Sequence, residues 1–173
     1  MKKGSVVYGF PCIGKSTLCD SKQNNGRFLD LESSDYQWLM TEEIKKMSVE
    51  ERKGIDKQKN PDWPDNYARA IIEKRKEYDY VFVAFEGKMQ CIKHNIPYWL
   101  IFPDYDCKEE YINRMRNRGN PEEFVQKIAT NFDNFVKGCY DDTTAERKIV
   151  LHKGEYLADA IKKIEQEELE HTL

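Results

Sequence analysis

Short apolar runs alternate with longer stretches of helical periodicity along most of the chain. The runs that predict β-strands lie at residues 5–8, 27–31, 80–85, 98–102 and 148–151. The third and fourth runs are almost entirely apolar, as is typical of strands that helices cover on both faces. This alternation predicts an α/β fold with about five parallel strands and helices on both sides of the sheet.

Apolar residues at helical spacing predict helices between these strands. We expect them at residues 15 to about 21, 65 to about 78, 107–118, 120 to about 138, and from about 156 onward. The fourth helix has Asn120 as its expected cap and Pro121 at its first position.

The two C-terminal helices each carry a clear apolar stripe. For the fourth helix the expected stripe consists of Phe124, Ile128, Phe132 and Phe135. For the last helix it consists of Tyr156, Leu157, Ala160, Ile161 and Ile164. Residues on such a stripe are expected to face the core.

Residues 35–64 do not follow the alternation of strand and helix. They contain an amphipathic piece at residues 36–47, a charged stretch, and the sequence Asn60-Pro61-Asp62-Trp63-Pro64. Two prolines around a tryptophan predict an ordered loop. Because the segment follows the second strand, we expect residues 35–78 to form an acceptor-binding insertion beside the active site. The insertion would belong to a single domain spanning residues 1–173.

Composition narrows the class of protein. The chain has 173 residues, of which 39% are hydrophobic and 34% charged, and its formal net charge is -3. These values predict a folded, soluble domain and disfavour nucleic acid as a partner, because no global basic field attracts it. No apolar run approaches the roughly 18 residues of a membrane helix, so no membrane partner is expected. Five cysteines without CxxC spacing predict free thiols and a cytoplasmic location.

The strongest chemical signal lies directly after the first predicted strand. The sequence Gly9-Phe10-Pro11-Cys12-Ile13-Gly14-Lys15-Ser16 matches G-x-x-x-x-G-K-S/T at every defined position, and Thr17 follows. In such a loop the backbone N–H groups face phosphate oxygens. The lysine reaches the β- and γ-phosphates and the serine hydroxyl ligates Mg²⁺. We therefore expect residues 9–17 to bind ATP and Mg²⁺, with Gly9, Cys12, Ile13, Gly14, Lys15, Ser16 and Thr17 as the contacts.

An acidic pair follows the second predicted strand. Asp30 and Glu32 are two residues apart, so on an extended chain both point to one face. The carboxyl ends of parallel strands share one edge of the sheet, which places the pair near the glycine-rich loop. There the carboxylates can hold Mg²⁺ or accept a proton from an attacking hydroxyl. The alternative is a pair of surface carboxylates at a strand end.

Three arginines follow the fourth predicted strand. Arg114 and Arg118 are i,i+4 neighbours on the helix predicted at residues 107–118, whereas Arg116 points away from them. Two guanidinium groups before a glycine can clamp a phosphoryl group during transfer. The alternative is a solvated basic face. We expect residues 104–120 to form a lid-like segment.

In their order along the chain, these features resemble the P-loop small-molecule kinases, the nucleoside-monophosphate-kinase and shikimate-kinase-like group. The resemblance implies a three-layer α/β/α P-loop NTPase fold with a helical lid and a substrate-binding insertion. It further implies that Lys15, Asp30, Arg114 and Arg118 are catalytic and that Ser16 and Asp30 hold the metal. The sequence is also similar to compact phage or bacterial (deoxy)nucleotide kinases in its Asp30-Leu31-Glu32-Ser33-Ser34 segment and its Asn60–Pro64 loop.

The resemblance also implies where an acceptor binds. The expected contacts are Glu32, Trp38, Trp63, Tyr67 and Arg69, together with Glu86 and Lys88. The last two stand in Phe85-Glu86-Gly87-Lys88, where nucleotide kinases carry an Asp-Gly-x-x-Arg or Asp-Arg signature. This departure leaves the identity of the acceptor open.

The expected function is Mg·ATP-dependent transfer of the γ-phosphoryl group to a small acceptor, with a (deoxy)nucleoside monophosphate favoured. Two alternatives stay open. One is an ATP-binding or ATP-hydrolysing module that acts in regulation or nucleic-acid processing. The other is a kinase for a non-nucleotide hydroxyl acceptor. The sequence leaves the oligomeric state open.

Overall fold

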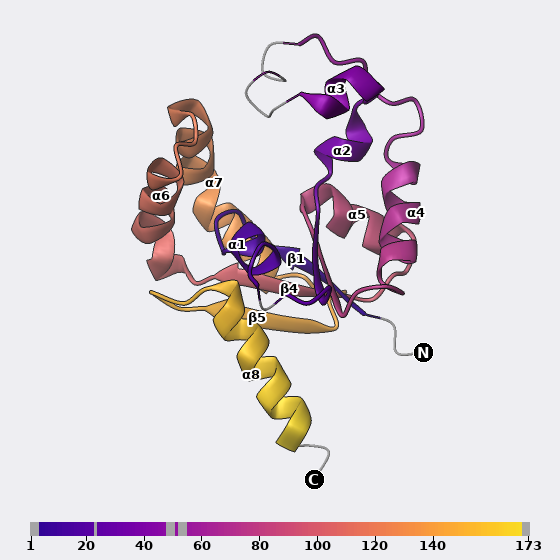
Figure 1. The fold of residues 1–173 in the computed structure, drawn as a ribbon. Coiled ribbons are helices and arrows are strands. Elements are labelled where there is room, and N and C mark those ends of the chain that lie inside the picture. The colour runs from indigo at the N-terminus through magenta and orange to yellow at the C-terminus, as the bar shows by residue number, and fades with distance from the viewer. Residues whose placement is uncertain (1–3, 23, 48–50, 52–54, 171–173) are drawn as a thin grey trace.

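A single parallel sheet organises the molecule. The computed structural model describes residues 4–22, 24–47, 51 and 55–170 (Figure 1). Its five strands lie in the order β2-β3-β1-β4-β5, and every pairing between neighbours is parallel. The strands are β1 (Ser5–Gly9), β2 (Phe28–Leu31), β3 (Tyr80–Val83), β4 (Tyr98–Pro103) and β5 (Arg147–Leu151). All five predicted strands are confirmed, and β3 ends two residues earlier than predicted.

Helices cover the sheet in an arrangement consistent with three layers. The described helices are α1 (Lys15–Cys19), α2 (Ser34–Gln37), α3 (Glu42–Lys46), α4 (Asp65–Lys74), α5 (Phe85–Lys93), α6 (Lys108–Asn117), α7 (Glu122–Tyr140) and α8 (Leu157–Glu170), with a 3₁₀ turn η1 at Tyr105–Cys107. Helix α1 contacts α8, and α4 contacts α5. Right-handed crossovers put α1 on one face of this sheet and α5 and α7 on the other.

Two groups of helices rise beside the carboxyl ends of the strands. In Figure 1, α6 and α7 stand on the left and α2 to α4 on the right, with α1 between them at the base. The expected amphipathic piece at residues 36–47 is divided into α2 and α3. An isolated antiparallel bridge between Trp38 and Lys59 ties the segment after α2 to the segment that leads to α4.

Helix α5 was not predicted, and it packs unusually close to the strand before it. A Cβ atom built on Gly87 would lie 2.5 Å from Cβ of Val83 in β3. Only glycine allows the helix to lie this near the strand. The run at residues 80–85 therefore contains both the end of a strand and the start of a helix.

The buried stripe of α7 differs from the predicted one at both ends. Its buried residues are Val125, Ile128, Phe132, Val136 and Cys139. Ile128 and Phe132 were predicted correctly, but Phe124 and Phe135 are 37% and 40% exposed. Tyr156 lies just before α8 and is 45% exposed, whereas the rest of the predicted α8 stripe is buried. The error has a physical cause: an aromatic residue at the edge of a stripe has the same spacing as one at its centre.

The core joins the central strand to both sides of the molecule. Val6, Val7 and all of β3 are buried. Phe10, just after β1, packs edge-on against Tyr111 of α6 and Phe132 of α7, with ring centroids 5.8 Å and 5.5 Å away. No helix among the described residues is long and apolar enough to span a membrane.

Candidate functional site

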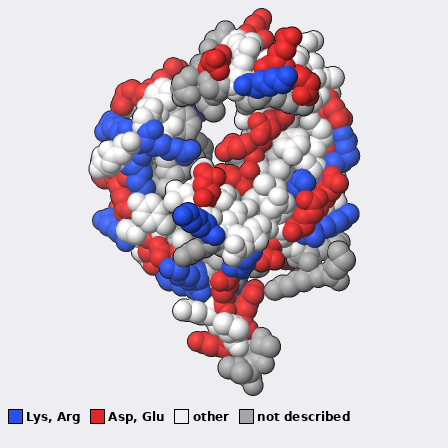
Figure 2. Space-filling model, in the orientation of Figure 1, with Lys and Arg blue, Asp and Glu red and all other residues white. Residues whose placement is uncertain are grey.

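A cavity of about 780 Å³ opens at the carboxyl ends of the strands. Its lining comes from the loop of residues 9–16 (the glycine loop), the start of α1, the ends of β2 and β3, the second half of α6, the turn after it, the start of α7, and the residue before α8. The lining residues are Pro11, Cys12, Gly14, Lys15, Ser16, Thr17, Asp30, Glu32, Ala84, Arg114, Asn117, Arg118, Asn120, Phe124 and Tyr156. Figure 2 shows the molecule hollowed here, with basic side chains on the left rim and acidic ones on the right.

The glycine loop leaves β1 at Gly9 and is held at both ends. The Phe10 N–H donates to the Ile101 carbonyl at 3.2 Å, and the Ile13 carbonyl accepts from the Leu157 N–H at 2.8 Å. Cys12 and Gly14 have φ values of 62° and 99°. Left-handed residues near the start of a helix turn successive backbone N–H groups to one side, which suits an anion.

Lys15 lies inside this loop. Its Nζ donates to the Gly9 carbonyl at 3.0 Å. Burial lowers the pKa of Lys15, while the nearby carboxylates of Asp30 and Glu32 act in the opposite direction. The Lys15 ammonium group is partly desolvated, and the hydrogen bond to Gly9 joins it to a neutral acceptor. An anion that enters the loop would therefore stabilise its charge.

Asp30 and Glu32 line the same cavity as the glycine loop. Their place after β2 predicted that they would lie near this loop. Ser16 Oγ donates to Asp30 Oδ2 at 3.5 Å, so the two expected metal ligands are neighbours. Burial raises the pKa of Asp30, and Lys15 and Ser16 oppose the shift. Burial and the Asp30 charge raise the pKa of Glu32.

The donor set fits a magnesium ion that shares its ligands with phosphate. No cluster of three or more metal-binding side chains occurs among the described residues. One hydroxyl and one carboxylate, from Ser16 and Asp30, match the few protein ligands that Mg²⁺ takes when phosphate oxygens and water supply the rest.

The two predicted lid arginines have different surroundings. Arg114 is 11% exposed; it forms an ion pair with Glu110 and donates to the carbonyls of Cys12 at 3.4 Å and Glu155 at 3.0 Å. Its guanidinium also lies 3.8 Å from the ring centroid of Tyr156. Arg114 thus ties the glycine loop to the segment before α8, and this is a structural arrangement that the sequence did not predict.

Arg118 is exposed at the end of α6 and lines the cavity. No side-chain hydrogen bond or ion pair of Arg118 occurs among the described residues, so its guanidinium can turn toward a ligand. Arg116 points elsewhere, as predicted, and pairs with Glu122 at 2.9 Å. Of the three arginines, Arg118 is therefore the one available to contact a phosphoryl group.

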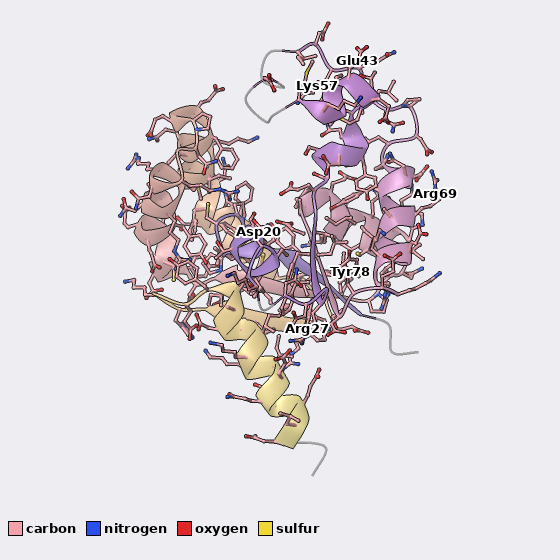
Figure 3. All side chains as sticks on the ribbon, viewed as in Figure 1. Asp20, Arg27, Glu43, Lys57, Arg69 and Tyr78 are labelled. Atoms are coloured by element: carbon pink, nitrogen blue, oxygen red, sulfur yellow. The ribbon has the colours of Figure 1, made fainter. Side chains whose placement is uncertain are left out.

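Most of the residues expected to bind the acceptor do not line the cavity. Tyr67 is fully buried, and its hydroxyl donates to the Leu31 carbonyl at 2.7 Å. Trp63 stacks on the Tyr67 ring, and Trp38 contributes its backbone to the bridge described above. Arg69 pairs with Asp62 on the outer side of α4 (Figure 3). These four residues therefore lie away from this cavity, and their role as acceptor contacts stays a prediction.

The residues after β3 are also turned away from the cavity. Glu86 accepts a hydrogen bond from Gln90 at 2.7 Å. Lys88 forms an ion pair with Asp142 at 2.7 Å, with side chains only 12% and 5% exposed. The buried carboxylate holds Lys88 between α5 and the segment after α7. Of the seven residues expected to contact an acceptor, only Glu32 lines the cavity.

Several lining residues were not predicted as site residues. Phe124 and Tyr156 place exposed aromatic rings on the cavity, and Asn117 and Asn120 add amide groups. The side-chain oxygen of Asn120 is buried without a hydrogen-bond partner among the described residues. Phe124 and Tyr156 have the spacing of core residues, so the helical pattern carried no signal that could have revealed them.

Comparisons with known proteins leave the family open. No protein-family model matches the chain, and no curated protein matches it. A crystal structure of an uncharacterized protein from Eubacterium ventriosum is similar at 16% identity, with a TM-score of 0.43 over 95% of this chain and 97% of that one. A likeness of this degree supports no conclusion about function.

Proposed function

We propose that this protein binds Mg·ATP and transfers the terminal phosphoryl group to a small acceptor. The observation that carries the proposal is the convergence of three groups on one cavity. These are the glycine loop with Lys15, the neighbouring Ser16 and Asp30, and the free guanidinium of Arg118. Phosphoryl transfer depends on positioning and charge neutralisation, and these groups supply both.

Each group has a distinct role in this proposal. The backbone of residues 9–16 and Lys15 hold the phosphates, and Lys15 exchanges its bond to the Gly9 carbonyl for phosphate oxygens. Ser16 and Asp30 hold the magnesium ion, which supplies charge neutralisation at the phosphates when bound. Arg118 stabilises the negative charge of the phosphoryl group during transfer.

The nucleoside part of ATP fits beside the glycine loop. Tyr156 presents an exposed ring there, and Arg114 lies over that ring. An aromatic ring with a cation behind it is a good stacking surface for a base. Arg114 is a positioning residue in this proposal, because its hydrogen bonds are used within the protein.

The cellular setting and the acceptor are parts of the same proposal. All five cysteines are free, which supports a reducing, cytoplasmic location. The family resemblance favours a nucleoside monophosphate as the acceptor, and that expectation stays a prediction.

A coupled assay for ADP release tests the proposal. The full chain is mixed with Mg·ATP alone and then with nucleosides, nucleoside monophosphates, sugars and hydroxy acids. We expect ADP release that depends on one acceptor, and its loss by at least about 100-fold in Lys15→Ala. Lys22→Ala, an exposed lysine just beyond α1, is the control and should keep full activity. If the rate of ADP release is the same with and without each acceptor, or rises when DNA or RNA is added, phosphotransfer is refuted. That result would favour the regulatory or nucleic-acid alternative.

Arg118→Ala gives a second test. Because Arg118 has no partner within the described residues, its removal should lower kcat more than it weakens ATP binding. Weaker ATP binding with kcat unchanged would contradict this role, because it would show that Arg118 binds substrate and transition state alike.

A further inference from the structure

An apolar stripe runs along the outer side of α5. Phe85, Met89 and Ile92 are spaced i, i+4 and i+7, so they share one side of the helix. These residues are 61%, 41% and 37% exposed. Gly87 and Cys91 lie on the opposite side of α5 and are buried. The helix therefore has an apolar side turned to solvent as well as one turned to the sheet.

Phe135 of α7 extends this stripe. The ion pair between Lys88 and Asp142 holds the end of α7 close to α5. Phe135 precedes Asp142 by seven residues, which is about two helical turns, so it lies on the side of α7 that faces α5. It is 40% exposed. The α5 patch consists of Phe85, Met89, Ile92 and Phe135.

The size of the α5 patch indicates the kind of contact it can make. At roughly 150–250 Å² for a large side chain, the exposed fractions leave about 300 Å² of apolar surface in water. Patches of this size on a monomer are often functional. Protein interfaces are about 57% apolar, so one centred on the patch would bury about 500 Å² on each side. That area is near the lower limit for a specific protein contact, which predicts weak, reversible association.

The charges beside the α5 patch fit a second copy of the same chain. Glu86, near the start of α5, and Lys93, near its end, are seven residues apart and lie on one side of the patch. In an antiparallel pair of α5 helices related by a two-fold axis, Glu86 of each copy lies beside Lys93 of the other. A parallel pair would bring like charges together. An anionic membrane fits less well, because it requires a basic rim.

We propose that the α5 patch is a two-fold interface through which the protein forms a weak homodimer, with α5 packed antiparallel on α5 of the second copy. The two-fold axis passes close to Met89. Phe85 of one copy then packs on Ile92 of the other, and the two Met89 side chains meet at the axis. The inference is independent of the proposed function, because no residue of the α5 patch lines the cavity.

Sedimentation equilibrium of the full chain tests the interface. Loading concentrations of about 5–500 µM cover the dissociation constant expected for a contact of this size, on the order of 1–100 µM. We expect the mean mass to rise from that of a monomer toward that of a dimer across this range. A mass that stays monomeric at every concentration would overturn the proposal.

Opposite charges placed at the axis give a sharper test. Met89→Lys and Met89→Glu each bring two like charges together, so each variant should weaken dimerisation by at least about tenfold. An equal mixture of the two variants should recover it, because lysine then meets glutamate. Leu169→Lys is the matched control and should dimerise like the wild type, because Leu169 is 68% exposed on α8. Thermal melts of dilute samples check that all three variants are folded.

Two further outcomes would count against the proposal. Dimerisation that both Met89 variants retain would place the interface elsewhere, and a mixture that does not recover dimerisation would exclude a two-fold contact at Met89. Co-sedimentation with vesicles of phosphatidylcholine and phosphatidylserine tests the other occupant. Vesicle binding by a monomeric wild type that is lost in Met89→Glu would assign the α5 patch to a lipid surface instead.

Discussion

Replacing Arg114 by methionine should loosen the connection between the glycine loop and the segment before α8. The variant keeps most of the side-chain stem but loses the guanidinium. With it go the hydrogen bonds to the carbonyls of Cys12 and Glu155 and the ion pair with Glu110. Contact with the Tyr156 ring is also weakened.

The expected loss of stability can be worked from these contacts. Removing one partner of a buried ion pair costs about 3–5 kcal/mol. Glu110 is 28% exposed and keeps hydrogen bonds from the Gly154 N–H, which places the cost at the lower end. For a domain of this size, about 3 kcal/mol corresponds to a melting temperature lower by about 6–12 °C.

Thermal unfolding of three arginine variants measures this effect. Arg116→Met is the control, because Arg116 pairs with Glu122 at the surface, where an ion pair contributes about 0–1 kcal/mol. Its melting temperature should fall by no more than about 4 °C. Arg118→Met should also stay near wild type, because Arg118 has no partner among the described residues.

One result would refute this reasoning. In that result, Arg114→Met has the same melting temperature as Arg116→Met, but its turnover falls as far as that of Arg118→Met. Arg114 would then leave its protein contacts and bind the phosphoryl group. The pair would then act together as a clamp, as the i,i+4 spacing predicts. A melting temperature of Arg114→Met well below that of Arg116→Met supports the positioning role of Arg114.

Three further predictions concern stability. Asp142→Ala should cost about 3–5 kcal/mol in urea unfolding, because it leaves Lys88 as an unpaired, nearly buried charge. Gly87→Ala should cost about 1–3 kcal/mol, because the new Cβ lies 2.5 Å from β3. Asp30→Asn should be more stable than wild type at about pH 7 and equal to it well below pH 3.8. Burial raises the pKa of Asp30 above its ordinary 3.8, so wild-type stability falls as pH rises through the raised value.

Each has its own control. The double variant Lys88→Met/Asp142→Leu should recover most of the loss, since it removes both charges. Gly138→Ala, with open space around the new Cβ in α7, should be neutral or stabilising. Equal effects of Gly87→Ala and Gly138→Ala would contradict the close packing of α5. An Asp30→Asn protein less stable than wild type at about pH 7 would show that the carboxylate stabilises the fold.

The fold was largely predictable because it follows from short-range patterns. Apolar runs and helical spacing located all five strands, and the order of elements predicted a parallel sheet. Helix α5 was missed for two reasons. Its first residue continues the apolar run of β3, and Gly87 has no side chain, so it interrupts the apolar stripe that would indicate a helix. The contact between Gly87 and β3 is visible only once helix and strand are packed together.

Part of the candidate site was also predictable from sequence, and part was not. Residues 9–17 are contiguous, so their spacing alone brings Gly14, Lys15 and Ser16 together. The nearness of Asp30 also followed from sequence, because parallel strands share one carboxyl edge. The glycine loop was therefore determined locally, whereas the place of the acidic pair followed from the predicted parallel sheet.

Only the tertiary structure decided which other side chains reach the cavity. Lys88 and Arg69 are basic residues near the expected site, yet Asp142 and Asp62 hold them elsewhere. Tyr156 and Phe124 looked like core residues, yet they face the cavity. The physical reason is that the sequence specifies which groups exist and how neighbours along the chain are spaced. The orientation of a long side chain depends on partners that folding brings from far along the chain.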